Sequence, residues 1–450
     1  YDESAYARLT SITDFYGRRL ELAYDAQGYS SSVTDPTVTP ARVFTYQRDA
    51  VGNLTAATDP LGQTTTYTYD SEHRLTRITD PQGAALDIGY SGERVASLVT
   101  DTSARYFSYD TAQNRALVID VVDGVAWRTA YMYDARGRVI GIENALGQSR
   151  ALTWDDDDNP MQLTDERGNT SSFTYDERGN MLSATDPLGQ VETYTYEPVY
   201  GHLASVTDAR GAQTRYEYNL YGNVTRVIDA LGQATTYTYD DCQCHLIAVT
   251  DPLSRTTRYG YDAWGNMSVI TDALGHVTHS TYDADGNLRA FTNASGKTFT
   301  TTYNANGLPI GVTDPLGRAI ALAYDGNGRV SSFTDALGRA TAYKYDALGR
   351  LTTGINAWGG QMQYTYAGAR GWNSVTNPNQ HTLTLSRDGL GRPTALTDAL
   401  GQTSQYQHDA NGNLTRRVDA NGQTTTFTYD ALNRLTFVDY PGAADDTTFA

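Results

Sequence analysis

Residues 324–345 read YDGNGRVSSFTDALGRATAYKY, and the rest of the chain is built from repeats of this stretch. Its leading tyrosine recurs at a constant spacing, at positions 261, 282, 303, 324, 345 and 366. In general form, the unit is Y-D-x-x-G-[NR]-L, a short run, T-D-[PA]-L-G-[QR], and a run rich in Thr and Tyr. A fixed period of this kind, about 21 residues, indicates an array of small supersecondary units.

Each unit carries two turn signatures, in which Gly stands three residues after Asp or Asn, as in Asp262 to Gly265 and Asp272 to Gly275. Asp at the start of a turn accepts hydrogen bonds from the backbone beyond it, and Gly supplies the left-handed residue of a type I turn with a G1 bulge. We therefore expect Gly317 and Gly338 to have positive φ. Runs such as residues 297–303 (KTFTTTY) favour strands. One repeat is predicted to be strand, turn, strand, turn.

Composition agrees with an all-β chain. The 450 residues include 41 Gly and 34 Tyr, and only 39% are hydrophobic. No segment keeps an apolar period near 3.6, so little helix is expected. No apolar run approaches the 18 or so residues that span a membrane. The net charge of −18 argues against nucleic acid or an anionic membrane as a partner.

The repeats run through the whole chain, and we interpret residues 1–450 as one continuous array. A lengthened loop at residues 35–40 interrupts the count, turn signatures fade between residues 90 and 133, and the turn at residues 377–380 lacks its Gly. None of these stretches resembles a linker. The chain opens on Tyr rather than Met and stops within a repeat, so we interpret it as a segment of a longer protein.

Two strands per repeat predict about 40 strands in one antiparallel ribbon. Because open twisted sheets rarely exceed about 10 strands, such a ribbon is expected to curl or coil around a hollow space. A propeller is the rival fold, since two repeats approach the length of a four-stranded blade. The signature recurs with every pair of strands rather than with every four, which favours the ribbon.

The sequence does not decide which face of the sheet the apolar side chains of one strand occupy. Leu288 and Phe291 are three residues apart, which would place them on opposite faces of a regular strand. Either both faces bury apolar groups, or a bulge intervenes. The recurrent tyrosines are expected to be structural and to stack between strands or neighbouring repeats.

Few residues suggest chemistry. His276 and His279 should point to opposite faces, so they cannot easily share a metal. Cys242 and Cys244 lie in a turn beside Asp241 and His245, but no second ligand pair exists, which favours turn residues or a local thiol pair over zinc. We predict no catalytic residue, no metal and no cofactor.

Two acidic stretches, residues 155–158 (DDDD) and 283–287 (DADGN), invite a calcium interpretation. Neither has the full ligand spacing with a closing Glu, and both coincide with the first turn of a repeat. Solvated turns are the favoured interpretation.

Two tryptophans are candidates for surface recognition. Trp264 and Trp358 each precede a turn Gly, where Ala, Leu or Asn is usual. An indole at a turn tip can stack on a sugar ring, or it can pack against an adjoining layer of the ribbon. The sequence favours the packing role and keeps glycan contact as the alternative.

The repeated pattern Y-D-x-x-G-[NR]-L-x-x-x-T-D-x-x-G, with a near-ideal copy at residues 345–351 (YDALGRL), resembles the RHS/YD-repeat family. The resemblance covers essentially the whole chain. The family includes shell proteins of insecticidal toxin complexes, bacterial polymorphic toxins and the extracellular teneurins. It implies a long antiparallel hairpin ribbon that spirals into a hollow β-shell, or β-cocoon, which in the toxin members encloses a C-terminal toxic domain.

Two functions follow from this resemblance. The first is a non-enzymatic bacterial shell that encapsulates and protects its own C-terminal toxin or effector domain. The second is an extracellular adhesion or carbohydrate-binding repeat protein, with cell-surface glycans or proteins as partners. Either one implies a secreted or cell-surface location. The Asp-dependent cleavage motif that ends many shell proteins of the family has no copy here.

Overall fold

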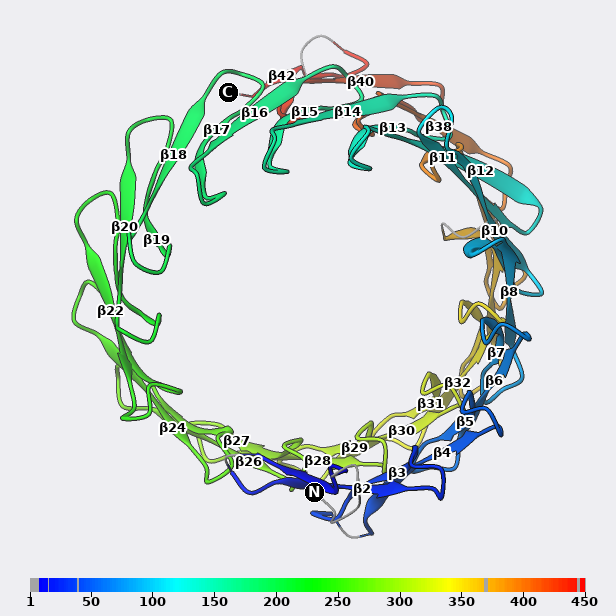
Figure 1. The fold of residues 1–450 in the computed structure, drawn as a ribbon. Helices are drawn as coiled ribbons and strands as arrows, with labels where there is room; N and C mark the ends of the chain where they lie inside the picture. Colours follow the sequence, from blue (N-terminus) through cyan, green and yellow to red (C-terminus); the bar gives the residue numbers. More distant parts are fainter. Residues whose placement is uncertain (1–7, 15, 39, 368–370, 443–445, 450) are drawn as a thin grey trace. The chain divides into compact units, whose positions relative to one another are not determined.

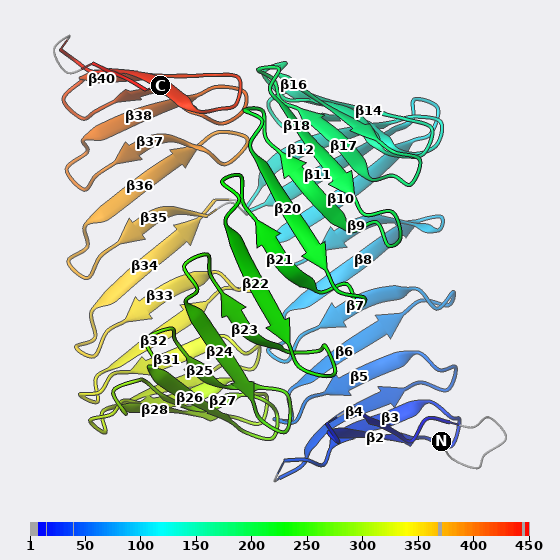
Figure 2. The ribbon, with the colours of Figure 1, turned by 90° about the vertical axis from the view of Figure 1, so that its left-hand side faces the viewer.

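In the computed structural model, residues 8–14, 16–38, 40–367, 371–442 and 446–449 are described. They contain no helix and form one antiparallel sheet of 42 strands, in which each strand pairs with the next along the chain (Figures 1 and 2). The long antiparallel ribbon predicted from the repeats is thereby confirmed. A propeller would divide the strands among separate blades, so that alternative is wrong.

The strands of the first half of the sheet are β1 (Ser11–Thr13), β2 (Arg19–Tyr24), β3 (Ser30–Asp35), β4 (Arg42–Arg48), β5 (Leu54–Thr58), β6 (Thr64–Tyr69), β7 (Leu75–Thr79), β8 (Ala85–Ser91), β9 (Arg94–Val99), β10 (Ser103–Asp110), β11 (Arg115–Val122), β12 (Val125–Tyr133), β13 (Val139–Glu143), β14 (Ser149–Trp154), β15 (Pro160–Thr164), β16 (Thr170–Tyr175), β17 (Met181–Thr185), β18 (Val191–Tyr196), β19 (Leu203–Thr207), β20 (Gln213–Tyr218) and β21 (Val224–Ile228). Those of the second half are β22 (Ala234–Tyr239), β23 (Leu246–Thr250), β24 (Thr256–Tyr261), β25 (Met267–Thr271), β26 (Val277–Tyr282), β27 (Leu288–Thr292), β28 (Thr298–Tyr303), β29 (Pro309–Thr313), β30 (Ala319–Tyr324), β31 (Val330–Thr334), β32 (Ala340–Tyr345), β33 (Leu351–Ile355), β34 (Gln361–Tyr366), β35 (Trp372–Thr376), β36 (Thr382–Arg387), β37 (Pro393–Thr397), β38 (Thr403–His408), β39 (Leu414–Val418), β40 (Thr424–Tyr429), β41 (Leu435–Asp439) and β42 (Thr447–Thr448).

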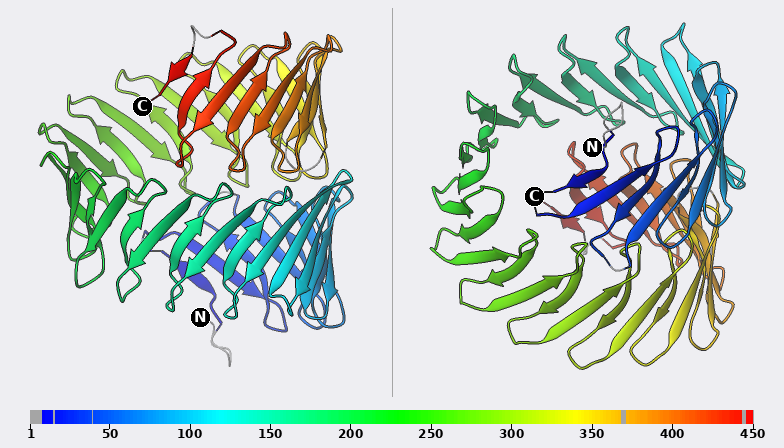
Figure 3. Two further views of the ribbon diagram at one scale, coloured as in Figure 1. Left: turned by 90° about the horizontal axis from the view of Figure 1, so that it is seen from above. Right: turned by 60° about the horizontal axis from the view of Figure 1, so that its bottom comes forward.

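The chain folds as two compact units, each made of segments far apart in sequence. Unit 1 comprises residues 1–89, 99–101 and 235–360, and unit 2 comprises residues 90–98, 102–234 and 361–450. In unit 1 the early strands β4 to β7 lie beside the later strands β28 to β32 (Figure 1). In unit 2 the strands β35 to β41 lie beside the strands β10 to β18 (Figure 3, left).

The turn that follows the repeat tyrosine, here called the Y-D turn, is organised by its first carboxylate. In residues 325–329, Asp325 Oδ1 accepts hydrogen bonds from the amides of Asn327 and Arg329, both at 3.0 Å. Asp325 Oδ2 accepts a third from Arg329 Nε at 2.7 Å. Gly328 donates to the carbonyl of Asp325 and has a φ of 75°. This geometry explains why Arg or Asn follows the turn Gly, because either side chain reaches the second carboxylate oxygen.

The second turn of the repeat, here called the T-D turn, has the same geometry. Asp314 Oδ1 accepts from the amides of Leu316 and Arg318, both at 2.9 Å. Gly317 and Gly338 each have a φ of 77°, as the sequence predicted. The irregular turn at residues 377–380 keeps this form with a left-handed Gln380 in place of Gly, at a φ of 65°.

A β-bulge explains how Leu288 and Phe291, three residues apart, lie on the same face of the sheet. Tyr282 pairs with Leu288 and Thr281 pairs with Ala290, so Arg289 is an extra residue in β27. The bulge rotates Leu288 back to the face of Phe291, opposite Tyr282 and Ser280 respectively. The same register shift recurs in most other Y-D hairpins, for example between Ala323 and Tyr324, whereas the Tyr109-Asp110 hairpin of β10 and β11 has none.

The repeat tyrosine joins neighbouring repeats through its hydroxyl. Tyr324 donates to the carbonyl of Pro309 at 2.7 Å, and Tyr345 donates to that of Val330 at 2.7 Å. The acceptor lies 15 residues earlier each time, at the start of the preceding Y-D hairpin's second strand. Where Trp154 replaces tyrosine, its indole Nε1 donates at 2.7 Å to the carbonyl of Val139, again 15 residues earlier. The tyrosines are therefore structural as expected, and hydrogen bonding rather than ring stacking is the contact that these repeats share.

Residues 103–133 depart from the repeat because their strands are longer. The strands β10, β11 and β12 have 8, 8 and 9 residues. Asp123 and Gly124 both have positive φ, which is the two-residue hairpin turn favoured by Asp-Gly. The faded signatures mark a different hairpin rather than a loss of the sheet.

The sheet is one layer thick and has almost no enclosed core. Apart from Ser205 and Gly141, the buried residues among those described are eight apolar ones, four of them alanines: Ala56, Ala116, Val122, Trp127, Ala130, Ile228, Ala248 and Val438. The accessible surface is 26242 Å², whereas a compact protein of 49.2 kDa would expose roughly 17,000 Å². The fold is therefore held by turns, ladder hydrogen bonds and contacts between ribbon segments.

Candidate functional site

The two candidate tryptophans occupy different surroundings. Trp264 lies in a Y-D turn of unit 1 whose Gly265 is so close to Tyr16 that an added Cβ would stand 2.6 Å from that ring. Trp358 lies in a T-D turn, is 78% exposed, and stacks against the guanidinium of Arg339, with the charged carbon 5.8 Å from the ring centroid. The turn of Trp264 thus faces another ribbon segment, and the indole of Trp358 faces solvent.

The two cysteines form a link within one turn. Cys242 and Cys244 are joined by a disulfide, with their Cα atoms 5.3 Å apart. The ligand atoms of Asp240, Cys242, Cys244 and His245 all lie within 4.8 Å of one another. A cysteine ligates a metal as the thiolate, and a disulfide sulfur is not one. The pairing agrees with the local pair that the sequence favoured, and our prediction of no metal is unchanged.

His245 connects this turn to the beginning of the chain. Its Nδ1 lies 2.7 Å from Asp240 Oδ2, and its Nε2 lies 2.8 Å from the hydroxyl of Tyr16. The ring of His245 also packs on Tyr261, at 4.4 Å between centroids. The cluster therefore works as a contact between two segments of unit 1. The link between Tyr16 and His245 has no signal in the sequence.

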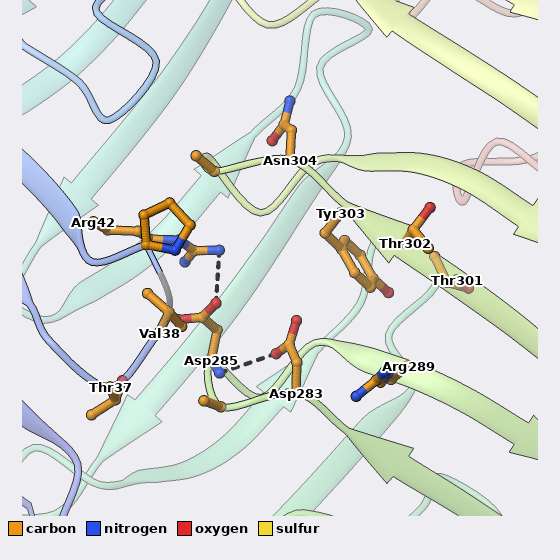
Figure 4. Close-up of a pocket in the computed structure, with 13 residues that line it drawn as sticks. Thr37, Val38, Arg42, Asp283, Asp285, Arg289, Thr301, Thr302, Tyr303 and Asn304 are labelled. Carbon is orange, nitrogen blue, oxygen red and sulfur yellow. Dashed lines mark hydrogen bonds and ion pairs between the residues drawn. The ribbon is translucent and has the colours of Figure 1, made fainter.

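A polar pocket of about 550 Å³ lies between the same two segments of unit 1, at the lengthened loop after β3 (Figure 4). Arg42 and Asp285 form an ion pair there, with 2.7 Å between Nη2 and Oδ2, and both side chains are largely buried. Asp283 Oδ1 accepts a hydrogen bond from the amide of Asp285. Tyr303 also lines the pocket. The second acidic stretch thus binds an arginine of another segment rather than forming a solvated turn.

Asp285, which lines the pocket, and its neighbour Asp35 have pKa values that are shifted in opposite directions. Burial raises the pKa of Asp285, against the opposing effect of the Arg42 charge. Burial also raises the pKa of Asp35, but hydrogen bonds from the side chain and amide of Thr37 outweigh it and lower that pKa overall. The interaction between the two carboxyl groups lowers the pKa of Asp35 and raises that of Asp285. The carboxyl pair of Asp35 and Asp285 is explained by the contact between the two segments, without a role in binding a substrate.

The first acidic stretch is also bound by arginine. Arg138 Nη1 lies 2.9 Å from Asp158 Oδ1, and it donates to the carbonyl of Asp155 as well. Asp158 takes the left-handed position of the turn, with a φ of 68°. The amides of Asp157 and Asn159 occupy Asp155 Oδ1. The carboxylates of Asp155 and Asp158 therefore stabilise the turn and its contact with the neighbouring repeat, while residues 156–158 are exposed, as a solvated turn would be.

A regular seam joins the two segments of unit 1 outside the pocket. Asn306 Nδ2 donates to Asp59 Oδ2 at 2.6 Å, and Asn327 Nδ2 donates to Asp80 Oδ2 at 2.6 Å. Arg329 Nη2 donates to Gln82 Oε1 at 2.5 Å. Every one of these contacts joins a T-D turn of the earlier segment to a Y-D turn that lies 247 residues later.

Unit 2 contains an equivalent seam of its own. Asn411, in a Y-D turn, donates to Asp165 Oδ2 of a T-D turn at 2.7 Å. A Cβ added to Gly389 would lie 3.2 Å from Leu146 Cδ2, again a Y-D turn against a T-D turn. In both units, the two edges of the ribbon are thus complementary to each other.

Sequence reasoning found the turns but missed these contacts. The T-D carboxylates of the seam are the same residues that organise every such turn, and the asparagines Asn306 and Asn327 stand at the third Y-D turn position, whose residue type varies from repeat to repeat. The sequence therefore does not show which of these residues also bind another segment. The lengthened loop at residues 35–40 was one visible signal, since this loop lies at the contact between Arg42 and Asp285. No helix of the described residues could serve as a transmembrane span.

Short hairpins repeated along a single-layer sheet, with segments joined edge to edge, define a structural β-repeat protein. The family model for the RHS Repeat matches residues 48–85, 282–319, 324–362 and 408–444, and that for the Teneurin YD-shell matches residues 100–297. The chain belongs to the RHS/YD-repeat family, and its role is of the structural, shell type.

Solved structures that match this chain include a crystal structure of TcdB2-TccC3-TEV. It has 11% sequence identity over 97% of this chain and 37% of that chain, with a TM-score of 0.47. The Tc holotoxin pore of Photorhabdus luminescens has 14% identity over 95% of this chain and 28% of that chain, with a TM-score of 0.37. The chain spans about a third of the length of these structures. No curated protein matched it.

Proposed function

We propose that residues 1–450 form one continuous array that is part of the wall of a hollow shell, and that this shell encloses and protects the protein's own C-terminal toxin or effector domain. The observation that carries the proposal is the seam between ribbon segments, where turn edges 247 residues apart are fastened by side-chain hydrogen bonds. Edge-to-edge fastening converts a ribbon into a continuous wall. The family assignment supports the same role.

The shell works as a secreted or cell-surface structure in a bacterium and has no enzymatic activity of its own. The disulfide between Cys242 and Cys244 supports that location, because disulfides persist mainly in oxidising compartments. The single-layer sheet supports a barrier role, since its backbone is hydrogen-bonded in the ladder and offers a protease few extended, unpaired segments.

Limited proteolysis tests the encapsulation directly. The full-length protein is digested with a protease beside the isolated C-terminal region, and the lifetimes of the C-terminal peptides are compared. We expect them to survive at least tenfold longer in the full-length protein. Equal rates of digestion would contradict encapsulation while leaving the fold intact.

An exposed adhesion or carbohydrate-binding surface is the second candidate. It is favoured by the exposed indole of Trp358, because aromatic faces stack on sugar rings. A glycan array with the purified protein, its Trp358→Ala variant and a Trp264→Ala control tests it. Binding that is lost in Trp358→Ala alone would favour adhesion, and an array without binding would reject it.

A further inference from the structure

The turn between β22 and β23 (Figure 2) contains both cysteines of the chain. Cys242 and Cys244 are exposed, and Asp240 and His245 lie partly buried beside them. The sequence suggested Asp241 as the acidic neighbour of the cysteines, whereas the structure places Asp240 there. Asp240 and His245 form the second ligand pair that the sequence did not reveal, so the dithiol form of this turn offers four metal donors.

A second turn of the same length explains the histidine but not the cysteines. The turn between β18 and β19 begins with Glu197 and ends with His202, and the Glu197 amide donates to the His202 carbonyl at 2.8 Å. His202 Nδ1 lies 3.5 Å from Glu197 Oε1. Val199 and Gly201 stand at the positions of the two cysteines. A carboxylate beside an imidazole is therefore a feature of these lengthened Y-D turns, and the two sulfurs are specific to the turn after β22.

The donor atoms already have tetrahedral separations along two edges. Cys244 Sγ lies 3.6 Å from His245 Nδ1 and 3.8 Å from Asp240 Oδ2. Tetrahedral zinc, with bonds of about 2.3 Å to sulfur and about 2.0–2.2 Å to nitrogen or oxygen, separates a sulfur from either donor by roughly 3.6 Å. Asp240 Oδ1 accepts from the amides of Cys244 and His245, which leaves Oδ2 to bind an ion. The 2.7 Å contact between Asp240 Oδ2 and His245 Nδ1 has to open to admit it.

We propose that reduction of the disulfide converts this turn into a Zn²⁺ site, with Asp240 Oδ2, Cys242 Sγ, Cys244 Sγ and His245 Nδ1 as the ligands. Two molecules of a small thiol reduce the S–S bond and leave as their own disulfide, which gives two cysteine thiols. Zn²⁺ then displaces both thiol protons and binds the thiolates. Two sulfurs with an imidazole favour Zn²⁺ over Mg²⁺ or Ca²⁺, which prefer oxygen. The disulfide form has no thiolate, so the prediction of no metal stands for that form.

Tyr16, in the first segment of unit 1, supplies the support that a metal-bound imidazole needs. Its hydroxyl lies 2.8 Å from His245 Nε2. A ligating histidine usually donates its other ring N–H to an acceptor, which fixes the tautomer whose remaining nitrogen binds the metal. The Tyr16 hydroxyl can accept that bond, so the zinc form keeps the contact between the two segments. The site does not depend on what the shell encloses.

Cobalt spectroscopy tests the site. The full-length protein is reduced with a phosphine, freed of it without air, and titrated with Co²⁺. Visible d–d bands report tetrahedral geometry, and near-ultraviolet sulfur-to-metal bands report thiolate ligation. We expect both sets of bands in the dithiol form, their loss when Zn²⁺ displaces Co²⁺, and neither set from this turn in the disulfide form. Comparing the two forms requires no substitution.

Variants assign the bands to this turn. Cys242→Ala and Cys244→Ala should each weaken Co²⁺ binding by more than about a hundredfold, because loss of a ligand costs more than loss of an outer-shell partner. Tyr16→Phe should weaken it about tenfold. His245→Asn should also weaken it, whereas the matched His202→Asn, in the lengthened turn without thiols, should leave it unchanged. Hydrogen exchange of β22 and β23 checks that each variant is folded.

Two outcomes would overturn the zinc site. One is reduced parent protein that shows no bands although Cys242 and Cys244 both react with a thiol reagent. The other is Co²⁺ binding that is equal in the parent and in folded Cys242→Ala, because the ligands would then lie elsewhere. Both outcomes are independent of the protease test of encapsulation.

Discussion

At the scale of the residue, the repeat tyrosine and the turn aspartate each have a defined atom-level role. The tyrosine hydroxyl satisfies a backbone carbonyl 15 residues earlier, as in Tyr324 to Pro309. The aspartate satisfies two amides of its own turn, as Asp325 does. A single-layer sheet has little core to stabilise it, so these hydrogen bonds carry much of the local specificity.

Removing one tyrosine hydroxyl tests that role. Tyr324→Phe should lower the free energy of unfolding by about 1 kcal/mol, because the carbonyl of Pro309 loses a partner. Tyr221→Phe is the control, since this tyrosine is 74% exposed at a turn tip. Denaturant titration and hydrogen exchange of β29 and β30 measure the effect. Equal effects in the two variants would refute the hydroxyl's role.

Two turn glycines differ in what an added side chain would meet. Gly338→Ala should cost about 1–2 kcal/mol through the left-handed φ alone, because nothing lies within 4 Å of its Cβ position. Gly338→Val should cost more, since a β-branched residue tolerates that φ poorly. Gly265→Ala should also cost more than Gly338→Ala, because its Cβ would meet Tyr16 at 2.6 Å. Gly338→Asn should be nearly neutral, as Asn433 adopts the same conformation naturally. Thermal melts of the four variants rank them, and a reversed order would show that the turn was assigned wrongly.

At the scale of the element, hairpins whose turns begin with Asp depend on an ionised carboxylate. The hydrogen bond from Arg318 lowers the pKa of Asp314, and the amides of Arg318 and Leu316 lower it further, against the opposing effect of desolvation. A carboxyl whose pKa is lower in the folded state contributes stability above its ordinary pKa of about 3.9, and that contribution is lost as the pH falls through the folded-state value. The same turn recurs along the ribbon, so the losses accumulate.

Acid should therefore loosen the hairpins below about pH 4. Hydrogen exchange between pH 3 and pH 6, after correction for intrinsic rates, should show the turn at residues 314–318 opening as the pH falls. Asp314→Asn should remove most of this dependence at that turn, because its amide oxygen still accepts from the backbone, as that of Asn356 does. A turn whose opening ignores pH in the parent protein would count against the carboxylate's role.

At the scale of the whole molecule, the sequence predicted the repeated hairpins but not which ribbon segments contact one another. The period and the turn residues predicted the strands, the turns and the left-handed glycines. These features depend on residues close together in sequence, and the same residues recur in each repeat. The seam could not be predicted in the same way. Asn306 and Asn327 occupy a turn position that every Y-D turn has, and the residues next to them in sequence do not indicate that Asp59 and Asp80 are their partners. The bulge at Arg289 and the acceptor of each tyrosine are backbone features that side-chain patterns do not report.

The ion pair between Arg42 and Asp285 is the sharpest test of contact between distant segments. Arg42→Ala should destabilise unit 1 by about 3 kcal/mol at neutral pH, because a largely buried carboxylate loses its cation. Arg19→Ala, which breaks an exposed pair with Glu21, should change stability by less than about 0.5 kcal/mol. Hydrogen exchange of residues 284–287 and denaturant titration measure both.

The pH dependence of the stability of Arg42→Ala shows whether Arg42 acts through its charge. Burial raises the pKa of Asp285, so its protonated form favours the folded state, and that stability is present at low pH and lost as the pH rises through the folded-state pKa. Arg42→Ala removes the opposing charge, so its deficit should be largest near neutral pH and shrink towards pH 5, before the turn carboxylates titrate. Asp285→Asn added to Arg42→Ala should recover much of the loss, since no charge is then buried. A deficit that is the same at pH 5 and pH 7, and unchanged by Asp285→Asn, would mean that Arg42 stabilises unit 1 by packing alone.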